Sequence, residues 1–132
     1  MQLTDFYFES KAVEGTHMVI PLPNGQDSGE WLNVIEPSAD AAQKANMAFL
    51  FAYQAKIAEL EPLKKDKTKY AVLLNEACEA LNLQLAMEVV NGWSFTEDFS
   101  REALAELLRQ YKALANVVAA YQSERRKALQ EK

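Results

Sequence analysis

The residues whose chemistry could support catalysis or metal binding are few and scattered along this chain. The single histidine, His17, has no second histidine, cysteine or acid at ligand spacing, so we interpret it as a structural residue. The single cysteine, Cys78, lies between acids in Glu76-Ala77-Cys78-Glu79. Because neighbouring negative charge disfavours the thiolate that a nucleophile needs, we interpret Cys78 as a small buried or half-buried apolar residue.

Neighbouring carboxylates are the remaining candidates for binding a hard cation or sharing a proton. They form two pairs, Glu97 with Asp98 and Glu102 with Glu106. No third or fourth ligand accompanies either pair, and acids near a helix start have a simple role in offsetting its dipole. The chain also has no glycine-rich phosphate loop and no nucleophilic serine motif. We therefore expect no catalytic residue, no metal, no cofactor and no enzymatic activity.

Charge is distributed unevenly along the 132 residues, whose 14 Lys and Arg against 19 Asp and Glu give a net charge of −5. Residues 1–36 hold six acids and one base, which accounts for all of it, while the remaining residues hold 13 of each. This balance disfavours binding to nucleic acid, which needs a positive surface. No signal sequence or membrane-spanning run is visible, so we expect a cytoplasmic protein that does not bind membranes.

Two basic clusters could contact phosphate, but neither is interleaved with the aromatic residues that stack on bases. The first contains Lys64, Lys65, Lys67 and Lys69, and the second is Arg125-Arg126-Lys127. We interpret the first as a solvated connection between helices, and the second as cations that offset the dipole at a helix end.

The first quarter of the chain predicts strands. Residues 16–22 and 30–35 show alternating apolar positions, and the intervening Asn24-Gly25 is typical of a hairpin turn. The aromatic run Phe6-Tyr7-Phe8 predicts a third strand at the edge.

The remainder of the chain predicts three helices. The first covers residues 38–61, capped by Ser38 and ended by Pro62, and the second covers 68–90, ended by Asn91-Gly92. The third covers 100–128 and is capped by Ser100. We expect a mainly helical α+β fold, with a small N-terminal antiparallel sheet of two or three strands packed on a bundle of about three helices. We expect one domain over 1–132, in which 1–36 are β-rich and 38–132 helical.

The first predicted helix has more apolar side chains than one buried stripe needs, because they cover most of its circumference. They are Met47, Phe49, Leu50, Phe51 and Tyr53. One interpretation is a central helix surrounded by the sheet and the other helices. The other is an uncovered apolar patch that binds a partner. The pattern leaves open which of these residues are core and which face of the helix would bind.

Two segments resemble the tail assembly chaperones of long-tailed, siphovirus-type bacteriophages and prophages. Residues 31–45 (WLNVIEPSADAAQKA) are similar to the family's strand and its serine entry into the first helix. Residues 89–93 (VVNGW) with 99–108 (FSREALAELL) resemble its Gly-Trp helix end, short loop and Phe-Ser-capped final helix. Lys112 departs from the pattern, which has a proline after the position of Tyr111, so we expect the final helix to continue unbroken.

The resemblance implies a non-catalytic protein that binds the tape-measure protein, keeps that long helical chain soluble and promotes polymerisation of the tail tube. It implies action in the host cytoplasm and absence from the mature virion. In many such phages a ribosomal frameshift makes a longer form that recruits the tail tube protein, and Glu131-Lys132 permits the adenine-rich codons for one. The exposed apolar residues of the first helix would bind the client, Trp93 would pack its loop over the core, and self-association is a further hypothesis.

Two other functions remain open. The chain is alternatively a structural head-to-tail or tail component that stays in the virion, or a bacterial protein-binding adaptor domain. The composition of purified virions distinguishes the first alternative from a chaperone.

Overall fold

The computed structural model describes residues 1–130, so Glu131 and Lys132, which permit the adenine-rich codons of a frameshift, lie outside the described residues. Within this range the chain forms a three-stranded antiparallel sheet, five α-helices and two short 3-10 helices. In chain order these are η1 (Leu3–Phe6), α1 (Phe8–Glu14), β1 (Thr16–Pro21), β2 (Asp27–Val34), α2 (Asp40–Leu60), η2 (Glu61–Leu63), α3 (Lys67–Val89), β3 (Val90–Trp93), α4 (Arg101–Gln110) and α5 (Ala113–Gln130). The predicted mainly helical α+β fold is confirmed.

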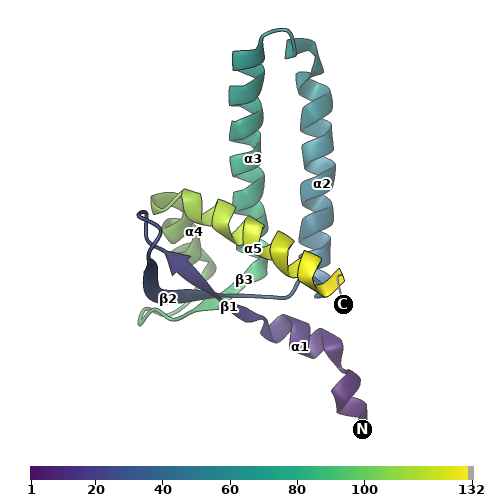
Figure 1. Cartoon of the computed structure of the whole chain (residues 1–132), viewed down its shortest axis with the longest axis vertical. Coiled ribbons are helices and arrows are strands. Elements are labelled where there is room, and N and C mark those ends of the chain that lie inside the picture. Colours follow the sequence, from purple (N-terminus) through teal and green to yellow (C-terminus); the bar gives the residue numbers. More distant parts are fainter. Residues whose placement is uncertain (131–132) are drawn as a thin grey trace.

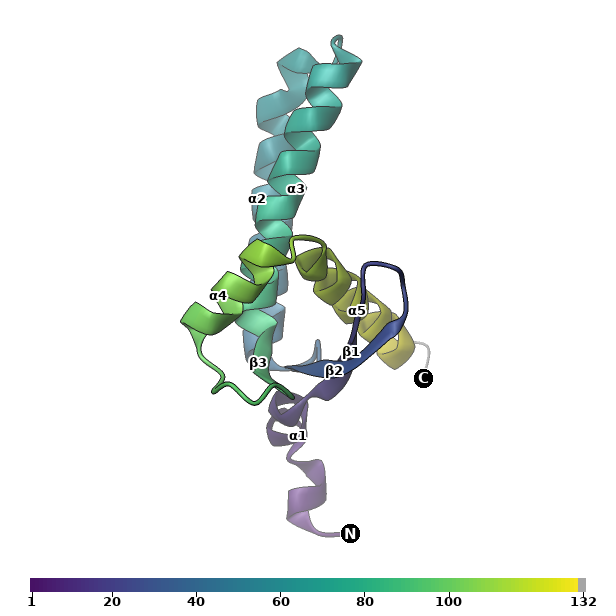
Figure 2. The ribbon, with the colours of Figure 1, turned by 90° about the vertical axis from the view of Figure 1, so that its left-hand side faces the viewer.

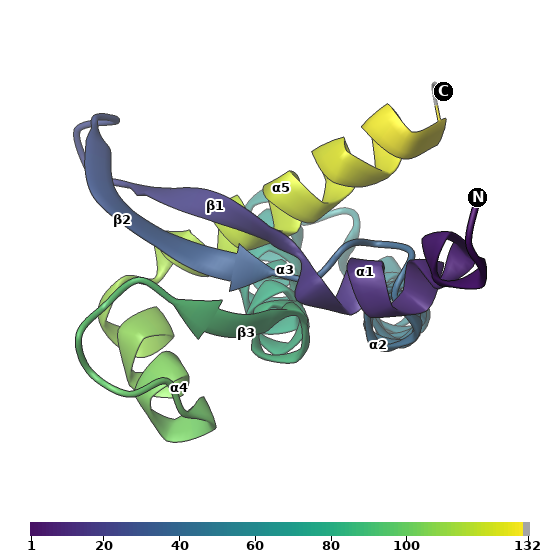
Figure 3. The same cartoon turned by 90° about the horizontal axis from the view of Figure 1, so that it is seen from below.

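The sheet has the order β1-β2-β3, with Met18 paired to Leu32 and Leu32 paired to Trp93. Alternation in the two predicted strands places Met18, Ile20, Leu32 and Val34 on the buried face, as expected. Figure 3 shows the strands side by side, with α5 on the side of β1 and α4 on the side of β3. The sheet, these two helices and the end of α3, which contributes Leu85, Ala86 and Val89, therefore enclose the core.

The third strand differs from the prediction. Phe6-Tyr7-Phe8 lies in η1 and at the start of α1, not in a strand, because no other strand lies alongside it to complete a ladder. The third strand is instead Val90–Trp93, which pairs with β2 from the far end of α3. Asn91-Gly92 therefore belongs to a strand rather than a helix cap, and Gly92 does not adopt the positive φ of a C-terminal helix cap.

The final helical segment is broken, and the prediction of one continuous helix was wrong. Although there is no proline, α4 ends at Gln110 and α5 begins at Ala113. At the break the Tyr111 hydroxyl donates to the carbonyl oxygen of Pro21 at 2.6 Å, which ties this corner to the β1–β2 turn. The bend lets both halves bury apolar residues in one core, to which they contribute Leu104, Leu108, Leu114 and Val118.

Helices α2 and α3 form a long antiparallel hairpin that projects from the sheet and the other helices (Figure 1). The turned view shows the same projection, with α1 and the N-terminus at the opposite end of the molecule (Figure 2). Ser38 does not cap α2 as predicted. The N-cap position is Ala39, and the first backbone N–H of the helix, that of Asp40, donates instead to the Glu9 carboxylate. The projection leaves α2 largely outside the core.

Candidate functional site

The part of α2 between Lys44 and Lys56 carries no charged residue. These eleven positions read ANMAFLFAYQA, and they contain neither glycine nor proline, so the helix continues without interruption. An uncharged helical surface of this length is typical of a buried helix. Here the helix stands on the projecting hairpin, so its apolar side chains divide between the face toward α3 and the face toward solvent.

Phe49 and Tyr53 lie on one face of α2. They are four positions apart and half-buried, and their rings stack with centroids 6.3 Å apart and an interplanar angle of 9°. Phe49 packs against the edge of the hydrophobic core and lines a hollow shared with Leu81 and Leu85 of α3. Phe49 therefore contributes to the packing of α2 against α3, and Tyr53 packs on Phe49.

Met47, Leu50 and Phe51 are the large apolar side chains of this stretch that face solvent. Their side chains are 47%, 43% and 63% exposed, and Phe51 is the most exposed of the predicted site residues. The structure thus separates the five residues into an inner pair, Phe49 and Tyr53, and an outer group of three, which we call the outer face of α2. The interpretation of a central helix surrounded by the sheet and the other helices is wrong, because α2 projects with α3 alone beside most of it (Figure 1), and the outer group is uncovered.

The outer half of the hairpin contributes nothing to the main core. Within residues 50–80, all of which the structure describes, Leu60 is the one buried side chain, and it is not part of the core cluster. The four lysines of the first basic cluster lie exposed around the tip. Lys64 pairs with Glu61 at 2.9 Å, and this hydrogen-bonded pairing raises the pKa of Lys64.

A groove of about 560 Å³ lies beside the hairpin where α2 and α3 meet the body of the molecule. Small and aliphatic side chains line it, with charged groups at its edges. The lining includes Ala41, Ala45, Ala48, Leu85 and Met87, and the charged groups are Lys44, Glu88 and Arg101. Arg101 lies 3.5 Å from Glu88, whereas Lys44 has no acidic group within 4 Å in the described part of the chain.

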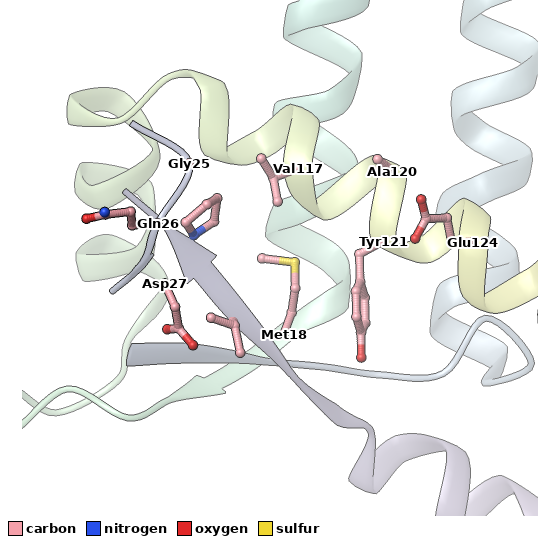
Figure 4. A pocket seen from close by; sticks show the side chains of 10 residues that line it. Met18, Gly25, Gln26, Asp27, Val117, Ala120, Tyr121 and Glu124 are labelled. Carbon is pink, nitrogen blue, oxygen red and sulfur yellow. The ribbon is translucent and has the colours of Figure 1, made fainter. Parts of the chain in front are cut away.

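A second hollow of about 400 Å³ lies between β1, the β1–β2 turn and α5. Figure 4 shows Met18 and Tyr121 at its centre, with Asp27 and Glu124 near its margins. The Tyr121 hydroxyl shares a hydrogen bond with Thr16, so this group serves to join α5 to β1. Nothing in this lining combines a nucleophile with a base, and the hollow does not assemble a reaction centre.

The chemistry-bearing residues of the sequence lie apart from one another. The His17 ring stacks on Trp31 with centroids 3.5 Å apart, and Cys78 is half-buried in α3. Glu106 forms an ion pair with Arg109, and no such contact joins it to Glu102 within the described residues. Hydrogen bonds from Arg109 and Gln110 lower the pKa of Glu106 to about 2. Within residues 1–130 no three His, Cys, Asp or Glu side chains gather where they could hold a metal ion, and no helix is long and apolar enough to cross a membrane.

Sequence reasoning missed an exposed apolar surface at the N-terminus. Leu3, Phe6 and Phe8 are 72%, 53% and 63% exposed, on a segment that packs no side chain in the core. The aromatic run was visible in the sequence, but we interpreted it as a strand, which would have been partly covered. Trp93, in contrast, lies where predicted, half-buried with its ring edge-on to Phe95 and Phe99.

Comparison with known proteins gives one finding that decides the family. The sequence model of a family described as phage tail assembly chaperone matches residues 34–130, which is most of the chain. This chain belongs to the phage tail assembly chaperone family. No curated protein and no solved structure matched it in the same comparison.

The family match shows which parts of this tail assembly chaperone are shared with its relatives. It begins at the last residue of β2 and continues through the hairpin, β3, α4 and α5. Both segments on which we based the resemblance lie wholly or largely within it. The outer face of α2 and the groove also lie within it, whereas α1 and β1 precede it. The family's description indicates a non-enzymatic role.

Proposed function

We propose that this tail assembly chaperone binds the tape-measure protein through the outer face of α2, keeps it soluble and promotes polymerisation of the tail tube. The observation that supports this is the uncharged stretch of α2 with Met47, Leu50 and Phe51 exposed on the projecting hairpin. Met47 lies three and four positions before Leu50 and Phe51, so the three side chains adjoin on the helix, and an exposed apolar patch of this kind supports a site of protein contact. The role requires no catalysis.

The hairpin is suited to a long helical client for geometric reasons. At about 1.5 Å per residue, helices of this length extend roughly 30 Å, so a client helix can lie along α2 over several turns. Apolar residues of the client that would aggregate in water would contact Leu50 and Phe51 instead. The outer face offers few anchor residues, so the client would bind weakly. Weak binding is compatible with release of the client during tail assembly.

The proposed sequence of events also includes the tail tube protein and the place of action. A frameshifted longer form would bring the tail tube protein to the bound client, in the host cytoplasm. The chaperone would leave before the virion matures. A structural tail component would instead remain in the particle, so detection of this chain in stoichiometric amount in purified virions would contradict the chaperone role.

The test is co-expression with the tape-measure protein of the phage or prophage that encodes this chain. We expect the client to be soluble with the wild-type chaperone, and insoluble with Leu50→Glu combined with Phe51→Glu. The matched control is Leu22→Glu in the β1–β2 turn, because Leu22 and Leu50 are 41% and 43% exposed. Equal client solubility with and without the chaperone would refute the function, and equal loss in the control would refute the site.

Circular dichroism of the variants separates binding from folding. The outer-face variants should remain as helical as the wild type, because these side chains pack little within the protein. Phe49→Glu should lower stability, since Phe49 contacts the core. If the outer-face variants unfold while Phe49→Glu does not, then our division of α2 into an inner pair and an outer face is wrong.

A further inference from the structure

Strand β1 lies at one edge of the sheet, because β2 pairs with it on one side and no strand within residues 1–130 lies on the other. The hydrogen bonds of Trp31 in β2 show which backbone groups of β1 face this open edge. The Trp31 N–H donates to the Ser94 hydroxyl at 2.8 Å, and the Trp31 carbonyl oxygen accepts from the Ser94 N–H at 3.0 Å. Both backbone groups of Trp31 therefore point away from β1.

The backbone groups of Val19 point to the open edge. Val19 is paired with Trp31, and in an antiparallel pair both residues either bond to each other or bond outward. This direction alternates along a strand, so the N–H and carbonyl groups of His17 face the same way as those of Val19. Both residues are exposed, and their outward backbone groups are therefore able to pair with a further strand.

The open edge ends at Pro21. This residue has no N–H, and its carbonyl oxygen already accepts from the Tyr111 hydroxyl at 2.6 Å. The ladder also shifts register between Val19 and Pro21. The edge therefore suits a short paired segment, about as long as the six residues of β1, rather than open-ended growth of the sheet.

The hollow of about 400 Å³ between β1 and α5 lies along this edge. Met18 and Val19 both line it, and since successive side chains point to opposite faces of a sheet, the hollow lies at the edge of β1 rather than over one face. Val117, Ala120 and Tyr121 of α5 form a largely apolar wall beside it (Figure 4). A strand added to β1 would turn every second side chain toward this wall, so apolar residues at alternate positions fit it.

Two acids lie at the margins of the hollow, near its opposite ends. Asp27 is paired with Pro21 at the end of β1, and Glu124 lies three positions beyond Tyr121, whose hydroxyl bonds to Thr16 at the start of β1. Neither carboxylate has a basic group within 4 Å among residues 1–130. A bound segment with a basic residue at each end has the complementary charge.

We propose that the open edge of β1 binds an extended segment of another protein, with alternate apolar residues between two basic ends, as a fourth strand of the sheet. Backbone pairing at His17 and Val19 supplies affinity, and the apolar wall and the two acids select the sequence. A second copy of this chain is a poor occupant, because two such edges side by side would bring like charges together. The site is separate from the outer face of α2 and does not depend on the proposed function.

The test measures binding of a dye-labelled synthetic peptide, KVTVTVK, to the full chain by fluorescence anisotropy. We expect the wild type to bind this peptide and not to bind EVTVTVE, whose ends repel Asp27 and Glu124. Two further peptides carry N-methyl groups, one on its valine amides and the other on its threonine amides. Because alternate amides of an added strand face β1, one methylated peptide should lose binding and the other should retain it.

Variants of the chain test the same contacts from the other side. Val19→Pro removes the outward N–H without breaking a bond of the ladder, so we expect it to lose peptide binding. Val19→Thr keeps the N–H and nearly the same shape, and as the matched control it should bind as the wild type does. Asp27→Asn with Glu124→Gln should weaken binding of KVTVTVK about fivefold. The charge control neutralises two exposed acids of α3, with Glu76→Gln and Glu79→Gln, and should leave binding unchanged.

Amide exchange of the wild type, followed by NMR, covers the case in which Val19→Pro fails to fold. Saturation with KVTVTVK should slow exchange at His17 and Val19 and leave Met18 unchanged, since the Met18 N–H already faces Leu32 of β2. The proposal is overturned if the peptide does not bind, if the two methylated peptides behave alike, or if His17 and Val19 stay unprotected. Self-association that Val19→Pro abolishes would also overturn it, because a second copy would then occupy the edge.

Discussion

The carboxylate of Glu9 accepts hydrogen bonds from the backbone N–H of Asp40, with N···O distances of 3.0 and 3.3 Å to its two oxygens. The first N–H groups of a helix have no partner within it, and a carboxylate there also offsets the helix dipole. In this chaperone the capping group comes from α1, 31 positions earlier in the sequence. This contact therefore caps α2 and also joins α1 to the start of the projecting hairpin.

Glu9→Ala should lower the free energy of unfolding by about 1 kcal/mol, the usual cost of losing an N-terminal cap. Chemical denaturation measures it. Glu14→Ala is the control, because Glu14 is also an exposed acid of α1 but only its backbone carbonyl oxygen accepts a hydrogen bond. Equal losses in the two variants would show that the charge of α1 matters rather than the cap.

Gly15→Ala should lower the free energy of unfolding by more than Gly25→Ala does. Gly15 joins α1 to β1 with φ of +70°, and an added Cβ would collide with the carbonyl group of Val34. The strained conformation alone costs roughly 1–3 kcal/mol, and the collision adds to it. Gly25→Ala is the control, since Gly25 has φ of +88° but open space around it. A loss no larger at Gly15 than at Gly25 would mean that β2 yields to the new side chain.

The local signals of the sequence predicted the elements that local chemistry determines. Alternation at Met18, Ile20, Leu32 and Val34 and the Asn24-Gly25 turn gave the first two strands, and Ser100 caps α4 as expected by accepting from the Ala103 N–H at 3.0 Å. These features depend on neighbours within a few positions, so they are visible without knowledge of the fold.

The features that depend on distant partners were not predictable in the same way. Phe6-Tyr7-Phe8 has the composition of a strand but no strand to pair with, whereas Val90–Trp93 is short and becomes a strand because β2 lies beside it. The exposure of Phe51 likewise depends on the hairpin's projection from the core, which its own helix does not encode. The sequence therefore identified the apolar excess of α2, but not which of its side chains are exposed.

The pair of Glu36 and Arg125 should show measurable coupling. The Arg125 guanidinium donates to Glu36 at 2.6 Å and ties α5 to the segment before α2, and Glu36 is largely buried. In a double-mutant cycle with Glu36→Gln and Arg125→Met, we expect a coupling free energy of roughly 0.5–3 kcal/mol. Additive losses would show that the two side chains do not interact in solution.

The pair of Glu106 and Arg109 predicts a pH dependence confined to acid. The pKa of Glu106 is about 2 in the folded protein against an ordinary value of 4.5, so its contribution to stability is complete above pH 4.5 and is lost as the pH falls from 4.5 through 2. Titration followed by NMR measures the midpoint. Arg109→Ala should raise it toward 4.5, though not fully, because Gln110 also donates to this carboxylate. An unchanged midpoint would remove Arg109 as the cause.

Hydrogen exchange should be faster in the outer half of the hairpin than in the helices that form the core. Residues 50–80 bury a single side chain, Leu60, so this region can open without disturbing the core that the sheet, α4, α5 and the end of α3 share. We expect the amides of α2 beyond Leu50 to exchange well before those of α5 around Val118 in the free protein. Addition of the client should slow exchange in α2 and leave Val118 unchanged. Equal protection of α2 and α5 in the free protein would show that the hairpin is stable without a partner. A bound client would then have no local unfolding of α2 to suppress, which would contradict this prediction.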